Sequence, residues 1–113
     1  MAMLVNEYHE DVMRTSNPCL SFRAMLEEGL MGINSEAGEA LDILKKHRFQ
    51  NHELDKEHIA IELGDVAWYL TEAAHALGYS LEEILLMNID KRNNRYPNGF
   101  EPERSLNRKE GDV

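Results

Sequence analysis

The sequence has few of the residues that crosslink a secreted scaffold or cross a membrane. Cys19 is its one cysteine among 113 residues, so no internal disulfide can form, which is typical of a protein in a reducing cytoplasm. The longest apolar run is far shorter than the roughly 18 residues that predict a membrane span. The N-terminus lacks a basic segment and soon reaches Glu7 and Glu10, so no signal peptide is predicted. We therefore expect a cytoplasmic protein with no membrane partner.

Basic residues are also scarce. The chain has 12 Lys and Arg against 21 Asp and Glu, which gives a formal net charge of −9. Proteins that bind nucleic acids neutralise phosphates with clustered Lys and Arg, so this balance argues against a nucleic-acid partner. The length of 113 residues is that of one domain.

Proline and glycine interrupt the chain rarely, and no useful length alternates with the period of a strand. The spacing of apolar residues predicts four helices, over residues 4–14, 22–46, 56–77 and 80–95. Ser21 is a candidate N-cap of the second helix. We expect an all-α, four-helix bundle-like domain over residues 1–100, followed by a polar and mobile tail over residues 101–113.

The two long helices each carry one apolar stripe. In the second helix the stripe comprises Phe22, Leu26, Gly29, Ile33, Ala37, Ala40 and Leu44. In the third it comprises Ile59, Leu63, Val66, Leu70, Ala74 and Leu77. Steps of three and four residues place each set on one face, so we expect the two helices to form a hairpin that buries both stripes. Four helices of this size enclose a thin core, which a partner subunit would complete.

Two acidic motifs resemble each other. Glu36 and Glu39 flank Gly38, while Glu62 and Asp65 flank Gly64. Residues three apart share one side of a helix, and at about 100° per residue both pairs lie on the same side of their own apolar stripe. In an antiparallel hairpin the four carboxylates would converge at one edge of the interface.

Both motifs carry a glycine in a helix interior, although each glycine costs about 1 kcal/mol relative to alanine. We expect Gly38 and Gly64 to allow the close approach of a backbone or a ligand. Converging carboxylates repel one another unless a cation neutralises them, and hard divalent cations such as Mg²⁺ prefer oxygen ligands. A single ExxE is more simply explained as a solvated helix face, but two matched motifs favour a metal site.

The fourth helix supplies groups of the opposite charge. Asn88, Lys91 and Arg95 are spaced i, i+3 and i+7, so they form one polar stripe. One amide and two cations on an inward face suit a phosphate chain. At this point an ordinary basic helix end, favoured by the helix dipole, explains the stripe equally well.

These motifs, taken in order, resemble the MazG-like nucleoside triphosphate pyrophosphohydrolases of the all-α NTP pyrophosphatase superfamily. The resemblance rests on Glu36-x-x-Glu39, the block Glu62-Leu63-Gly64-Asp65-Val66-Ala67-Trp68-Tyr69-Leu70, and Asn88-x-x-Lys91-x-x-x-Arg95-Tyr96-Pro97. It extends over most of the chain and ends near Phe100. One departure is Arg92, which stands where the family usually has leucine.

The resemblance implies hydrolysis of a nucleoside triphosphate (NTP or dNTP) to the monophosphate and pyrophosphate by a metal-activated water. It implies that Glu36, Glu39, Glu62 and Asp65 bind Mg²⁺, with Mn²⁺ as a possible substitute, or that one of them orients the water. Lys91 and Arg95 would offset phosphate charge and Asn88 would donate a hydrogen bond. Tyr69 would contact the nucleotide, although a structural tyrosine is as good an explanation.

Other functions stay open on the sequence alone. Within the superfamily, the alternatives are a phosphoribosyl-ATP pyrophosphatase and an enzyme that prefers dUTP or dCTP. A non-catalytic helical dimerisation module is a different class, and the acidic motifs argue against it. Nucleotide-pool housecleaning would be the role of the leading candidate. We expect a homodimer or homotetramer, because Ile61 and Trp68 lie opposite the apolar stripe of their helix and a second copy would cover them.

Three residues near the acidic motifs have simpler explanations. Lys46 lies near Glu39 and could reach a phosphate, but an ion pair with Asp42, four residues earlier, is the stronger interpretation. His58 lies four residues before Glu62 and is interpreted as a surface histidine. Cys19 has no partner at a spacing that predicts a nucleophile.

Overall fold

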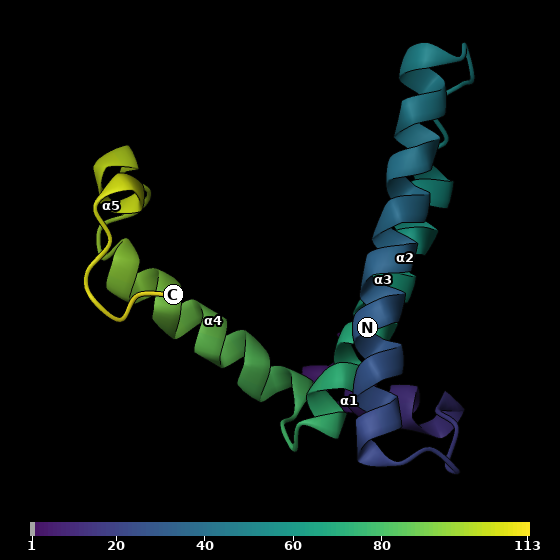
Figure 1. Cartoon of the computed structure of the whole chain (residues 1–113), viewed down its shortest axis with the longest axis horizontal. Coiled ribbons are helices and arrows are strands. Elements are labelled where there is room, and N and C mark those ends of the chain that lie inside the picture. The colour runs from purple at the N-terminus through teal and green to yellow at the C-terminus, as the bar shows by residue number, and fades with distance from the viewer. Residues whose placement is uncertain (1) are drawn as a thin grey trace. The chain divides into compact units, whose positions relative to one another are not determined.

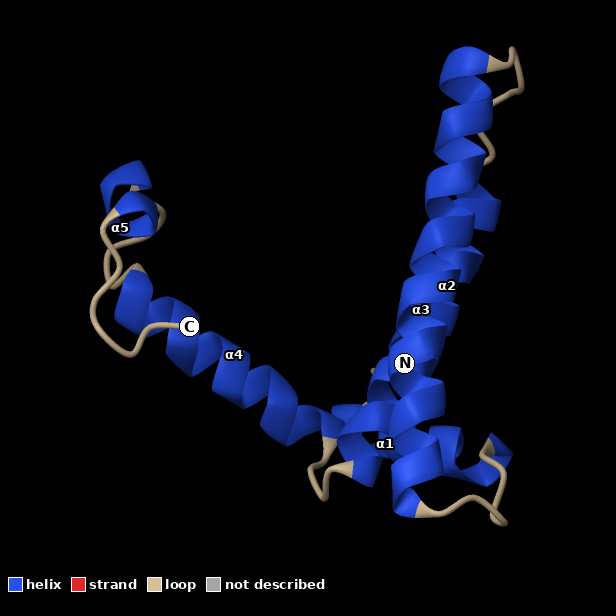
Figure 2. Ribbon diagram, viewed as in Figure 1, coloured by secondary structure: helices blue, strands red, loops and turns tan. Residues whose placement is uncertain are grey.

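The computed structural model describes residues 2–113 and contains five helices. They are α1 (Val5–Thr15), α2 (Phe22–Phe49), α3 (Lys56–Ala76), α4 (Leu81–Arg95) and α5 (Pro102–Leu106) (Figure 1). No strand occurs among the described residues, so the predicted all-α class is confirmed (Figure 2). Among these same residues, no helix has the length and apolar character needed to cross a membrane.

The four predicted helices are confirmed, with α2 continuing to Phe49 instead of ending near Lys46. Side-chain caps explain where the two long helices begin. The Ser21 hydroxyl accepts a hydrogen bond from the Ala24 N–H at 3.1 Å, as predicted, and the Asp55 carboxylate accepts one from the His58 N–H at 3.0 Å. The tail prediction missed α5, a short helix that begins at Pro102. Proline fits the first turn of a helix because its missing N–H has no intrahelical partner there.

The chain divides into two compact units, residues 1–81 and residues 82–113. The first unit contains α1, α2, α3 and the first residue of α4. The second contains the rest of α4 and the C-terminal segment with α5. The predicted boundary at residue 100 remains a prediction.

In the first unit, α2 and α3 lie side by side along their lengths (Figure 1). The face that α2 turns to α3 coincides with the predicted apolar stripe only in part, at Gly29. Met25, Gly29 and Gly32 are buried there, whereas Phe22 and Leu44 of the stripe are 67% and 46% exposed. The prediction rested on the spacing of apolar residues, but α2 is apolar on more than one side. The side with small residues packs on α3 because it allows the two helices to approach more closely.

The closest approach between the two helices is at Gly29 and Gly32. A Cβ atom at Gly29 would lie 2.9 Å from both the Cβ and the backbone nitrogen of Ala73, and one at Gly32 would overlap the Tyr69 ring. The expectation that Gly38 and Gly64 allow the approach of another backbone is wrong within this chain, because a Cβ at either would meet open space. A ligand at these two glycines remains a prediction.

Helix α1 packs on α3 and binds Trp68. The Trp68 indole Nε1–H donates to the Thr15 hydroxyl at 2.9 Å, so a helix of the same chain contacts this side of α3. A contact of a second copy with Trp68 remains a prediction. Ile61, on the same side of α3, is 57% exposed.

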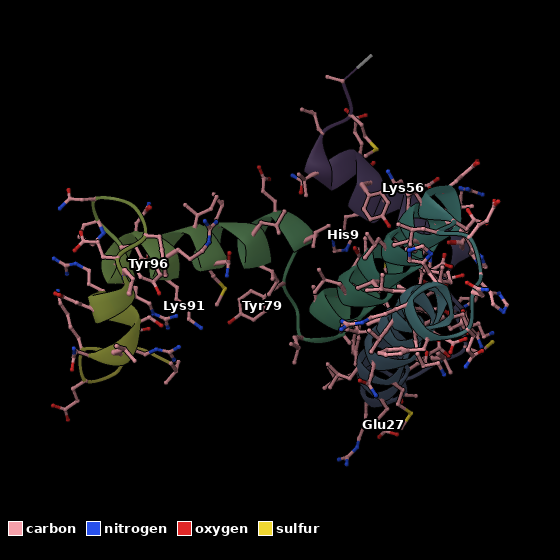
Figure 3. All side chains as sticks on the ribbon, turned by 90° about the horizontal axis from the view of Figure 1, so that it is seen from above. His9, Glu27, Lys56, Tyr79, Lys91 and Tyr96 are labelled. Atoms are coloured by element: carbon pink, nitrogen blue, oxygen red, sulfur yellow. The ribbon has the colours of Figure 1, made fainter. Side chains whose placement is uncertain are left out.

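The other end of the α1–α3 contact is a pair of histidines (His9 is labelled in Figure 3). The Leu81 N–H donates to His9 Nδ1 at 3.0 Å, and His9 Nε2 lies 3.0 Å from His75 Nδ1. Because His9 Nδ1 accepts, a neutral His9 carries its proton on Nε2 and donates it to His75. Since Leu81 begins α4, His9 satisfies one of the N–H groups that a helix start leaves without an intrahelical partner.

Candidate functional site

Three acids of the two motifs meet between α2 and α3. Glu36, Glu62 and Asp65 each bring one carboxylate oxygen within 4.8 Å of the others. Glu62 is only 7% exposed, Glu36 is half-buried and Asp65 is exposed. The two glutamates lie farther inside the seam than the sequence predicted, because α2 presents the side that contains Gly32 and Glu36 to α3.

A hydrogen bond links two of these acids and shifts the pKa of each. The hydrogen bond with Glu62, helped by burial and the neighbouring acids, raises the pKa of Glu36 to about 7. The same hydrogen bond lowers the pKa of Glu62. With both acids ionised, Glu36 Oε2 and Glu62 Oε2 would be buried without a hydrogen-bond donor, and a proton on Glu36 supplies one.

Glu39 and His58 contact the same buried acid. A hydrogen bond with Glu39 contributes to the lowered pKa of Glu62, and Glu39, Glu62 and His58 line one surface groove. His58 Nε2 lies 3.1 Å from Glu62 Oε1. The sequence interpretation of His58 as an exposed histidine did not include this contact, which its i, i+4 spacing from Glu62 could have indicated.

The donor set fits a hard divalent cation. All the converging atoms are carboxylate oxygens, and two buried oxygens lack a donor. Mg²⁺ binds a few carboxylates and fills its remaining positions with water or phosphate oxygens. A cation bound here would neutralise the charge of these carboxylates. Glu36, Glu62 and Asp65 are the residues that would hold it, with Glu39 beside them.

Tyr69 lies farther along the same seam, between this cluster and a second pair of acids. Burial is the main cause that raises the pKa of Tyr69, followed by Glu36 and Glu28. Glu72, one turn beyond Tyr69 on α3, is fully buried, and burial together with a hydrogen bond to Glu28 raises its pKa to about 7. The sequence analysis did not select Glu72, because an acid in a helical apolar pattern gives no local sign of burial.

The three polar residues predicted on α4 line one cavity in the second unit. Asn88, Lys91 and Arg95 border a cavity of about 620 Å³. Arg104 and Lys109 of the C-terminal segment border it as well. Figure 3 labels Lys91 and Tyr96 beside this segment. Four cations therefore line the cavity, and Arg95 is in a buried ion pair.

Two side-chain contacts orient the polar groups of this cavity. The Arg92 Nε–H donates to Asn88 Oδ1 at 2.8 Å, which leaves the amide N–H groups of Asn88 free to donate. Arg95 donates to both carboxylate oxygens of Asp112, at 2.8 and 2.6 Å. Asp112 was not predicted as a site residue, because its partner Arg95 lies 17 residues away.

The simpler interpretation of Lys46 is confirmed. Lys46 Nζ lies 3.0 Å from Asp42 Oδ2, and Lys45 binds the other oxygen of the same carboxylate at 2.8 Å. The hydrogen bonds with Lys45 and Lys46 lower the pKa of Asp42 to about 2. Lys46 is therefore committed to a local ion pair on α2.

The sequence profile of the MazG nucleotide pyrophosphohydrolase domain matches residues 25–100, which is more than half of the chain. The chain belongs to this family. No curated protein sequence and no solved structure matches it. The matched region contains both acidic motifs and the three polar residues of α4, and it ends before Asp112.

Proposed function

We propose that this protein hydrolyses a nucleoside triphosphate, NTP or dNTP, to the monophosphate and pyrophosphate with a divalent cation. The observation that carries the proposal is the convergence of Glu36, Glu62 and Asp65 in a chain of the MazG family. An all-oxygen site suits the hard cations that accompany triphosphates.

In this proposal the acids hold the cation and the attacking water. Mg²⁺, or Mn²⁺ in its place, would neutralise phosphate charge and lower the pKa of a bound water. Glu36, Glu62 and Asp65 provide the ligands. Glu39 is the fourth ligand or orients the water. His58 holds the Glu62 carboxylate through its Nε2–H.

The substrate-binding residues are Asn88, Lys91, Arg95 and Tyr69. The two cations offset charge on the phosphates, and the Asn88 amide donates a hydrogen bond. Tyr69 offers an aromatic ring beside the acid cluster. The role that fits this chemistry is clearance of nucleotides from the cytoplasmic pool. Phosphoribosyl-ATP, dUTP and dCTP are the alternative substrates.

We also propose that the protein is a homodimer or homotetramer. The support is the large apolar side chains on the outer faces of the α2–α3 hairpin. The most exposed of them on these two helices include Leu30, Met31, Leu41, Ile61 and Leu63. A two-fold pair would bury such exposed apolar side chains.

A product assay tests the proposed reaction. The protein is incubated with Mg²⁺ and a panel of ribo- and deoxyribonucleoside triphosphates, and phosphorus NMR identifies the products. We expect pyrophosphate and the monophosphate from at least one nucleotide, and no activity from Glu62→Gln. Orthophosphate and the diphosphate as primary products would contradict the proposal. Glu27→Gln is the matched control, because Glu27 (labelled in Figure 3) is an exposed α2 acid that pairs with Arg23.

A further inference from the structure

The C-terminal segment beyond the matched region contacts one of the proposed substrate-binding residues. We propose that Asp112 is a positioning residue for Arg95, and that the segment over residues 101–113 completes the phosphate-binding cavity of the second unit. This inference rests on the proposed function, because it assigns Arg95 to phosphate. It adds residues outside the family match, which ends at residue 100.

The ion pair is bidentate and largely removed from water. Arg95 Nε lies 2.8 Å from Asp112 Oδ2, and Arg95 Nη2 lies 2.6 Å from Asp112 Oδ1. The side chains of Arg95 and Asp112 are 13% and 15% exposed. Both residues line the cavity that Lys91 and Asn88 also border. Parallel charge-assisted hydrogen bonds of this kind fix the orientation of a guanidinium group.

A tight turn brings the Asp112 carboxylate to Arg95. Gly111 has φ 86°, a left-handed conformation that favours glycine, and the Asp112 N–H donates to the Lys109 carbonyl at 3.1 Å. The turn therefore places Lys109 and Asp112 at the same cavity. The pKa of Asp112 is lowered, first by the hydrogen bond with Arg95, so this carboxylate stays ionised at neutral pH.

The geometry of the pair leaves part of Arg95 for a ligand. A guanidinium has five N–H groups, and Asp112 uses the one on Nε and one on Nη2. The N–H groups on Nη1 and the second N–H group on Nη2 lie at the other edge of the guanidinium. This edge can bind a phosphate in the same bidentate way. The Tyr96 ring lies under the guanidinium, 5.9 Å from Arg95 Cζ to the ring centroid. Asp112 thus fixes the plane of Arg95 without occupying that edge, and Tyr96 holds the same guanidinium through its ring and a side-chain hydrogen bond.

A competing interpretation is that Asp112 inhibits the protein by taking the place of a phosphate on Arg95. The two interpretations predict opposite effects of the same substitution. If Asp112 positions Arg95, Asp112→Asn weakens the binding of phosphate groups. If Asp112 competes with phosphate, Asp112→Asn strengthens it.

The experiment measures pyrophosphate binding by calorimetry and nucleotide hydrolysis in the full-length chain. We expect Asp112→Asn to weaken pyrophosphate binding and to lower kcat/KM about tenfold, mainly through KM, with partial recovery in Asp112→Glu. Glu27→Gln removes one charge from an exposed acid of α2 that pairs with Arg23 and does not line this cavity, and we expect it to stay within about twofold of the parent. Unchanged or tighter binding in Asp112→Asn would overturn the inference.

A spectroscopic measurement tests the contact without any activity. In the parent, the Arg95 Nε–H should give a resolved NMR signal that exchanges slowly with water, and Asp112→Asn should remove it while the other signals keep their positions. An Arg95 signal that does not change would overturn the inference. If the parent releases no pyrophosphate from any nucleotide, the proposed function fails. In that case, the calorimetry and the NMR signal still decide the role of Asp112.

Discussion

The Tyr69 ring on α3 packs directly against the backbone of α2 at Gly32, where a Cβ atom would overlap it. This contact sets how closely the two helices approach beside the acid cluster, because Glu36 is one turn beyond Gly32 and Asp65 is one turn before Tyr69. The sequence therefore needs a glycine at 32 for a steric reason. Gly38 and Gly64 have no such requirement within the chain.

Gly32→Ala should destabilise the protein. The added methyl group forces the Tyr69 ring and α2 apart, and overpacking of this kind typically costs about 1–3 kcal/mol. Gly38→Ala is the matched control on the same helix, and it should stabilise the uncomplexed chain by up to about 1 kcal/mol through helix propensity. Urea unfolding of both variants measures the difference. Equal effects would mean that the Gly32–Tyr69 contact does not limit the helix approach.

Glu72→Gln should stabilise the protein at high pH more than at low pH. Burial and Glu28 raise the pKa of Glu72 to about 7, so the folded state binds more protons than the unfolded state between about pH 4.5 and 7. Stability that depends on the neutral acid is present at low pH and is lost as the pH rises through 7. Glutamine keeps the shape without the charge, and we expect a gain of about 1–3 kcal/mol at pH 8. Thermal unfolding at pH 5 and pH 8 checks this sign.

His9 should affect the pH dependence of folding stability in the opposite sense to Glu72. Burial, and then His75, lower the pKa of His9 below its ordinary value of 6.5. The unfolded state therefore binds more protons, and stability is lost as the pH falls below about 6.5. Glu10 opposes this shift. His9→Gln retains an acceptor for the Leu81 N–H and a donor to His75 but cannot be protonated. This variant should therefore lose less folding stability as the pH falls. An unchanged acid profile in this variant would exclude His9 as the cause.

Mg²⁺ or Mn²⁺ should raise the melting temperature, because a ligand that binds only the folded state stabilises it. Glu62→Gln and Asp65→Asn should abolish the rise, and Glu39→Gln should reduce it. The exposed pair of Arg23 and Glu27 again supplies the control, Glu27→Gln. A full response to metal in Glu62→Gln would locate the cation elsewhere.

Arg92→Leu should weaken substrate binding, although leucine is the residue usual in the family that the sequence resembles. The Arg92 Nε–H holds Asn88 Oδ1, so its removal allows the amide to turn. We expect KM to rise by about twofold to fivefold with little change in kcat, since only the orientation of one hydrogen-bond donor is lost. A fall in kcat alone would contradict this role.

The sequence predicted helix positions well because capping and apolar spacing are local properties. Ser21 illustrates this, since the start of α2 depends on one side chain and the next turn. The packing face of α2 could not be predicted in the same way. It is set by the close contact of Gly29 with Ala73, which are 44 positions apart, and not by the larger apolar residues of the predicted stripe.

In the candidate site, too, the sequence predicted the local features but not those that depend on packing. Spacing alone brought Glu36 and Glu62 together as candidates, because matched motifs on two antiparallel helices meet at one level. It could not predict the burial of Glu62, which follows from the side that α2 presents to α3. Asp112 lies after a turn in a polar tail, and a salt bridge across 17 residues leaves no periodic pattern.

The hydrogen bond from Leu81 to His9 also constrains the order in which the first unit is assembled during synthesis. The two residues are 72 positions apart, whereas α2 and α3 are neighbours joined by a short loop. The helical hairpin can therefore form as soon as α3 leaves the ribosome. His9 can form its hydrogen bond with Leu81 only after residue 81 has been synthesised. Until then the start of α1 lacks this anchor, so a nascent chain halted before residue 81 should expose α1 to proteases that the finished protein resists.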